Sequence, residues 1–88
     1  MVSKLLKVTH EAGIHARPAA AVVETCSRFK SSIALVKGEL RANGKSIMNV
    51  MLLAAEYGAE ILVEADGPDE QAALDAVDKL FAEHFRQG

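Results

Sequence analysis

The sequence predicts an α+β fold in which a four-stranded antiparallel sheet is covered on one face by three helices, in the order βαββαβα. Two observations carry this prediction. Four short segments have the apolar runs or alternation of strands, and three others repeat apolar residues at helical spacing. The helices stand singly among the strands, an order typical of an α+β sandwich. At 88 residues the chain is too short for two independent cores, so we expect one domain over residues 1–88.

Composition and charge exclude several classes of function. Ten basic and twelve acidic residues give a net charge of −2, without the basic excess typical of nucleic-acid-binding proteins. No apolar window approaches the roughly twenty residues of a membrane-spanning helix, and the N-terminus lacks a signal-peptide pattern. Cys26 is the only cysteine, so an intrachain disulfide is impossible. We therefore expect a cytoplasmic monomer that binds no nucleic acid and inserts into no membrane.

The N-terminal part of the chain predicts a strand over residues 2–8 and a helix over residues 16–29. Lys4 falls on the inward face of the strand, so we expect it near a sheet edge or the strand start. Five residues at helical spacing form the expected buried stripe of the helix: Ala19, Val22, Val23, Cys26 and Phe29. Cys26 is therefore expected to be a small buried side chain and not a reactive thiol. A different, small and polar face of the helix could dock against a partner: Ala16, Ala20, Glu24 and Ser27.

The middle of the chain predicts two strands over residues 33–36 and 39–42, joined by a hairpin turn. Ser46 is a preferred N-cap, so a second helix is expected from there to residue 55. The face of this helix that is expected to pack inward carries Val50, Leu53 and Ala54. Another face carries Ile47, Met48 and Met51, for which the residue pattern alone favours the core. The alternative for these three is an exposed, adaptable apolar patch that binds partners.

The C-terminal part predicts a strand over residues 60–65 and a third helix that ends near residues 84–88. The segment between them has the composition of a helix start, with Gly67 as the cap and Pro68 as the first helical residue. Five apolar residues at helical spacing predict the buried face of this helix: Ala73, Leu74, Val77, Leu80 and Phe81.

Residues 13–20 join the first strand to the first helix and place His15 at the joint. Pro18 suits the first turn of a helix, because the amide that proline lacks would have no intrahelical partner there. His15 and Ala16 are therefore expected beside the free amides and the positive end of the helix dipole, which together form an anion site. The positive end also disfavours a charged imidazole, so the histidine is available as a neutral nucleophile.

This arrangement predicts that His15 accepts and holds a phosphoryl group. The residue pattern alone also leaves open the alternative of a solvated loop histidine, which is the interpretation for His10 and His84. The backbone amides of Ala16 and Arg17 are the expected hydrogen-bond donors to the phosphoryl oxygens. The guanidinium of Arg17 matches phosphate geometry and can neutralise the transferring oxygens in the transition state. The chain offers no second catalytic group near His15 beyond Arg17, which argues against a small enzyme.

Metal and nucleotide sites are not expected. His10, His15 and His84 do not cluster with cysteine or carboxylate residues at metal-ligand spacing. The sequence Gly44-Lys45-Ser46 matches only the end of a phosphate-binding P-loop, and Glu39 occupies the position of the glycine that this motif requires upstream. We therefore expect neither a cofactor nor bound ATP.

Two motifs together, residues 13–20 and Gly44-Lys45-Ser46-Ile47-Met48, resemble those of the HPr family, the histidine-containing phosphocarriers of the bacterial phosphotransferase system. The resemblance runs in register from about Val2 to the C-terminus. It implies an open-faced β-sandwich with strand order 1-4-2-3. It also implies that His15 is phosphorylated on its δ1 nitrogen by enzyme I, which takes the group from phosphoenolpyruvate, and passes it to an enzyme IIA component. Such a carrier is a protein substrate and not an enzyme.

The resemblance also implies regulation at Ser46, by phosphorylation through HPr kinase/phosphorylase. A phosphate there would add charge beside Ile47 and Met48 and weaken partner binding. The docking surface for partners is expected to combine the polar face of the first helix with Ile47, Met48 and Met51.

Asn49 departs from the family pattern, because many members with this serine context have glycine there. With Glu24 and Ser27, it makes the docking face less basic than in members that carry lysines. A sugar pathway and a nitrogen-type branch both stay open. The alternative function is a regulatory HPr-like module that acts through the Ser46 surface and carries no phosphate on His15.

Overall fold

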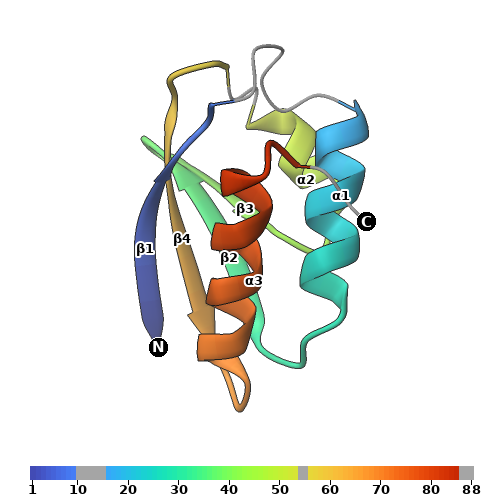
Figure 1. Cartoon of the computed structure of the whole chain (residues 1–88), viewed down its shortest axis with the longest axis vertical. Helices are drawn as coiled ribbons and strands as arrows, with labels where there is room; N and C mark the ends of the chain where they lie inside the picture. The colour runs from blue at the N-terminus through green and yellow to red at the C-terminus, as the bar shows by residue number, and fades with distance from the viewer. Residues whose placement is uncertain (10–15, 54–55, 86–88) are drawn as a thin grey trace.

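The structure, a computed structural model, describes residues 1–9, 16–53 and 56–85, and of Ala16 only the backbone. Its elements follow the predicted order βαββαβα (Figure 1). They are β1 (Val2–Lys7), α1 (Ala16–Ser27), β2 (Ser32–Lys37), β3 (Leu40–Asn43), α2 (Ile47–Leu52), β4 (Glu60–Asp66) and α3 (Glu70–Ala82).

The four strands form one antiparallel sheet in the order β1-β4-β2-β3, with all three helices on the same face (Figure 1). This is the strand order that the resemblance implied, and the α+β prediction is confirmed. β1 lies at one edge of the sheet, where Lys4 reaches α3 and its Nζ lies 2.5 Å from Oδ2 of Asp78. Lys4 is therefore near an edge, as predicted, and its inward position is compatible with charge because a carboxylate meets it there.

The core lies between the sheet and the helices. α3 packs over β1 and β4 and also against α1, and α2 packs against α1 and β3. The predicted inward face of α3 is buried at all five positions, as are Ala19, Val22 and Cys26 of α1. The strands contribute alternate residues: Ile33, Leu35, Ala42, Ile61, Val63 and Ala65.

α1 ends two residues earlier than predicted, at Ser27. The next two amides make short-range bonds, Arg28 N to Thr25 O and Phe29 N to Cys26 O at 3.2 Å each, which tighten the helix end and turn the chain toward β2. Phe29 and Val23 are only half-buried against the core, so the predicted stripe is correct at three of its five positions.

The predicted start of α3 was wrong by two residues. Asp69 is the N-cap and Glu70 is the first helical residue, so Pro68 precedes the helix. Gly67 has φ +152°, and a Cβ there would lie 2.6 Å from Cα of Ser31, so this position requires glycine for both conformation and space. The Glu70 carboxylate accepts a hydrogen bond from the Gly67 amide at 3.1 Å, which closes the turn before the helix.

The hairpin between β2 and β3 and the turn after it also differ from prediction by single residues. β3 runs one residue later than expected, after a turn in which Gly38 has φ +59°. The next turn brings Gly44 against the core, where an added Cβ would lie 2.9 Å from Sγ of Cys26. Glycine is therefore needed at residue 44 for close approach of the backbone to α1.

Candidate functional site

The predicted phosphoryl acceptor, His15, lies outside the described residues, as does His10. α1 begins at Ala16, the residue directly after His15 and the start that the sequence predicted. Arg17 is exposed and Pro18 is buried. Since the first amides of a helix have no intrahelical acceptor, the backbone at Ala16 and Arg17 supplies the donors that an anion bound at this end would need.

The face of α1 that the sequence proposed for docking is exposed at the side chains that the structure describes. Ala20, Glu24 and Ser27 are exposed, while the side chain of Ala16 is outside the described residues. Glu24 carries the one charge among these three side chains, and it pairs with Arg28 at 3.5 Å, with both side chains exposed. This pair contributes little to stability because water screens it. The face therefore offers small and weakly charged groups to a partner.

The residues that the pattern alone placed in the core are exposed on α2. Ile47, Met48 and Met51 are 44%, 72% and 45% exposed, so the core prediction is wrong and the alternative of an exposed face is correct. The physical reason is that α2 packs against α1 and β3 through Val50 and the following Leu53, so its other sides face outward. Ala54 lies outside the described residues.

Leu52 joins this surface and was missed by the sequence analysis. It is 72% exposed and stands four residues after Met48, which is the spacing of neighbours on one helix face. That spacing was the available signal. We define the apolar patch of α2 as Ile47, Met48, Met51 and Leu52. α2 packs against α1, so the patch and the outward side of α1 belong to neighbouring elements (Figure 1).

Ser46 is the N-cap of α2, as predicted, and it is half-buried. Its Oγ accepts a hydrogen bond from the backbone N–H of Asn49 at 3.3 Å and a second one from Asn49 Nδ2 at 3.1 Å. The backbone of Asn43 stabilises the same turn. Its backbone carbonyl accepts from the backbone N–H of Ser46, and its backbone N–H donates to Asn49 Oδ1. The part played by Asn43 and Asn49 was not predicted.

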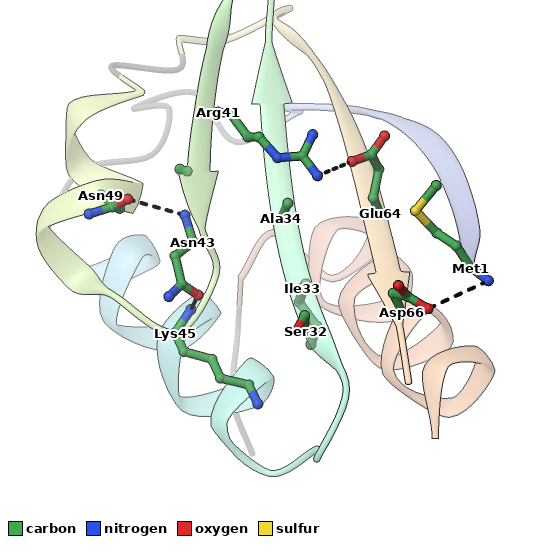
Figure 2. Close-up of a pocket in the computed structure, with 11 residues that line it drawn as sticks. Met1, Ser32, Ile33, Ala34, Arg41, Asn43, Lys45, Asn49, Glu64 and Asp66 are labelled. Atoms are coloured by element: carbon green, nitrogen blue, oxygen red, sulfur yellow. Dashed lines mark hydrogen bonds and ion pairs between the residues drawn. The ribbon is translucent and has the colours of Figure 1, made fainter. Parts of the chain in front are cut away.

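A hollow of about 510 Å³ lies on the sheet face away from the helices (Figure 2). Arg41 and Glu64 reach toward each other across it, with Nη2 2.6 Å from Oε1 in a geometry that makes an ion pair but no hydrogen bond. Lys45, Asn43 and Asp66 line its rim (Figure 2). Arg17 is not among the described residues that line this hollow.

Two other candidate reactive residues in the described part of the chain are Cys26 and His84. Burial raises the pKa of the Cys26 thiol to about 12, against a smaller lowering by Lys45, so this cysteine is not a nucleophile near neutral pH. His84 is exposed, and its Nδ1 lies 3.3 Å from the hydroxyl of Thr9. Among the described residues no three His, Cys, Asp or Glu side chains gather as metal ligands would, and no helix is long and apolar enough to cross a membrane.

Comparison with known proteins decides the family. A family model described as the phosphorylation site of the HPr component of the phosphotransferase system (PTS) matches residues 2–83. The chain belongs to the HPr family. Curated phosphocarrier proteins HPr from Treponema pallidum and Xylella fastidiosa are 49% and 44% identical to it over 87 residues, with at least 98% of each chain covered. The crystal structure of HPr-C-His from Thermoanaerobacter tengcongensis superposes with a TM-score of 0.94 at 35% identity, covering 100% of this chain and 99% of that one.

Membership of the HPr family establishes the function of this chain. It is a phosphoryl carrier of the phosphotransferase system and not a catalytic enzyme, as the sequence predicted. Its partners are components of that system such as enzyme I and enzyme IIA.

Proposed function

We propose that His15 is the residue on which this HPr-family chain carries its phosphoryl group. The δ1 nitrogen attacks the phosphorus of phospho-enzyme I, the bond from that phosphorus to enzyme I breaks, and the same exchange later moves the group to enzyme IIA. The observation that carries the proposal is the start of α1 at Ala16, directly after the histidine. The matched family model, which is described by its phosphorylation site, spans this position.

In this proposal the start of α1 binds the phosphoryl oxygens. The amides of Ala16 and Arg17 donate to them, and Pro18 has no amide to give. Arg17 is exposed, so its guanidinium is able to follow the group as it moves between histidines and to neutralise the oxygens in the transition state. Neither a metal nor a cofactor is part of this mechanism.

The proposed docking surface combines the outward side of α1, with Ala16, Ala20, Glu24 and Ser27, and the apolar patch of α2. Small residues on α1 permit close approach, and flexible methionines on α2 adapt to partners of different shape. The two elements pack together, which supports their use as one surface next to the start of α1.

Ser46 is the proposed regulatory site, phosphorylated by HPr kinase/phosphorylase. A phosphate on Ser46 would place about two negative charges at pH 7 directly before Ile47 and Met48 and so weaken the binding of partners to the apolar patch. We also propose that the chain acts as one HPr-like domain over residues 1–88, as a monomer, in the cytoplasm.

The test of the proposal is labelling by phosphoenolpyruvate and enzyme I. The wild-type chain should acquire an acid-labile phosphate, and His15→Ala should acquire none. His84→Ala is the matched control, because His84 is an exposed histidine on the C-terminal side of α3, and its labelling should equal that of the wild type. Absence of label from the wild type with a competent enzyme I would instead favour the regulatory module that acts through Ser46.

A further inference from the structure

The hydroxyl of Ser46 is held by two hydrogen bonds from one residue. The backbone N–H of Asn49 donates at 3.3 Å and the side-chain Nδ2 donates at 3.1 Å. A serine hydroxyl has two lone pairs, so both are engaged as acceptors in this arrangement. The first bond is the ordinary N-cap contact that any residue with a backbone N–H can supply at this helical position. The second depends on the asparagine side chain.

The orientation of the Asn49 amide follows from its other partner. The backbone N–H of Asn43 points at this amide from 3.2 Å (Figure 2). A backbone N–H can only donate, so the atom facing it is the oxygen of the amide, and the nitrogen is the atom that faces Ser46. Asn43 is itself held in the turn, where its carbonyl accepts from the amide of Ser46 at 3.0 Å.

We propose that Asn49 is a positioning residue that slows phosphorylation of Ser46. The inference rests on the proposed regulation at Ser46 and names Asn49 as a residue that limits the rate of that phosphorylation. In the transfer from a nucleoside triphosphate, Oγ forms a bond to the γ-phosphorus, the bond from that phosphorus to the β-phosphate oxygen breaks, and the hydroxyl proton passes to a base of the kinase. A lone pair of Oγ must be free for this attack, so one of the two bonds must break first, and loss of the bond from Nδ2 is the one that leaves the helix cap in place.

Asn49 is well placed for such control because removing its side chain leaves the helix cap intact. The backbone N–H of residue 49 still donates to Ser46 after substitution by alanine, and alanine favours the helix. Since Asn43 is exposed, its backbone N–H can donate to water instead. The substitution therefore removes one hydrogen bond from the hydroxyl and the acceptor of the Asn43 N–H, and it leaves the cap bond in place.

The experiment is phosphorylation of Ser46 by HPr kinase/phosphorylase with ATP, measured as initial rates for the wild type and Asn49→Ala. One hydrogen bond fewer on the attacking oxygen should raise kcat by roughly three- to tenfold. KM should stay within about twofold, because the variant retains the apolar patch and the lost bond acts on the chemical step. Thermal unfolding of both proteins checks that the fold is unchanged.

Asn43→Ala is the matched control. The substitution removes the side-chain amide of Asn43, whose Oδ1 accepts from the backbone N–H of Lys45 at 2.9 Å. It keeps the backbone N–H of residue 43, which orients Asn49. Its kcat should equal that of the wild type. An unchanged kcat in Asn49→Ala, an effect on KM alone, or an equal rise in Asn43→Ala would each overturn the restraint by Asn49.

A different result would separate this inference from the function on which it rests. Another HPr phosphorylated in parallel shows that the kinase is active. If that HPr is labelled while both the wild type and Asn49→Ala stay unlabelled, Ser46 is not a regulatory site and the inference fails with it. Labelling of the wild type and the variant at equal rates would leave the regulation standing and remove only the part assigned to Asn49.

Discussion

At the scale of single residues, the carboxylate of Asp69 accepts three hydrogen bonds from the two residues just before β2. The donors are the Ser31 hydroxyl at 2.5 Å and the amides of Ser31 and Lys30 at 2.9 and 3.0 Å. These hydrogen bonds, that of the Ser31 hydroxyl foremost, lower the pKa of Asp69 from 3.8 to about 2. The charged form is therefore favoured in the folded protein, where it joins the start of β2 to the start of α3.

Acid should weaken this junction. Because the pKa of Asp69 is lower in the folded than in the unfolded chain, its contribution is fully present above about pH 4 and is lost as the pH falls toward 2. The side-chain amide introduced by Asp69→Asn does not titrate, so the stability of that variant should fall less steeply between about pH 4 and 2. Urea unfolding across this pH range measures the difference. Parallel pH profiles for the two proteins would show that Asp69 has no such linkage.

Arg17 is the residue whose removal should affect transfer without affecting the fold. It is exposed, so Arg17→Ala should leave the melting temperature within about a degree or two, in keeping with the small effects of surface substitutions. Loss of the charge that neutralises the phosphoryl oxygens should slow transfer from phospho-enzyme I by roughly tenfold or more. Rapid-quench kinetics provide the rate, with Arg28→Ala, an exposed arginine just beyond α1, as the control. Equal rates in all three proteins would exclude Arg17 from the site.

At the scale of elements, the sequence predicted what periodicity determines and missed what depends on distant segments. α3 has one apolar stripe and charged residues elsewhere, so its buried face followed from spacing alone. α2 is apolar on nearly every side, so spacing could not say which side meets the core. The start of α3 was misplaced because Asp69 bonds to Ser31, 38 residues away, and no local pattern records that contact.

The apolar patch of α2 should contribute to binding and little to stability. Met48 is exposed, so Met48→Ser should leave the free energy of unfolding almost unchanged. If the side chain is buried by a partner, the same change should weaken binding to enzyme I by roughly 1–2 kcal/mol, about tenfold in Kd. Calorimetric titration measures the affinity. Leu5→Ser is the control, since Leu5 is 56% exposed on β1 and pairs with Leu62 on the sheet, away from the patch. Equal losses in both variants would argue against a specific role for Met48.

At the scale of the whole molecule, the sheet order was beyond the reach of the residue pattern. β1 pairs with β4 and β4 with β2, so the central pairings join segments separated by the helices. Periodicity gives the faces of each strand but not its neighbours, and only the family resemblance supplied the order. For the site, spacing and composition predicted the start of α1 and the Ser46 cap. The bonds from Asn43 and Asn49 were not foreseeable, because an asparagine side chain can pair with many kinds of donor and acceptor.

Because the helices cover only one face of the sheet, substitutions at neighbouring positions of β2 should lower the free energy of unfolding by unequal amounts. Leu35 is fully buried against the helices, so Leu35→Ala should lower the free energy of unfolding by about 2–5 kcal/mol. Val36 lies on the opposite face and is only half-buried, so Val36→Ala should have a smaller effect. Urea unfolding of the two variants tests this, and equal losses would contradict a core restricted to one face.

The packing of Cys26 beneath Gly44 has a practical consequence. A thiol that is fully buried, with a pKa of about 12, reacts with an alkylating reagent only in molecules that have opened. Since it is the only cysteine in the chain, each alkylation event reports one opening of the region between α1 and the β3–α2 turn. The rate of thiol modification, followed by mass spectrometry, therefore reports local unfolding of this region without an engineered cysteine or tag.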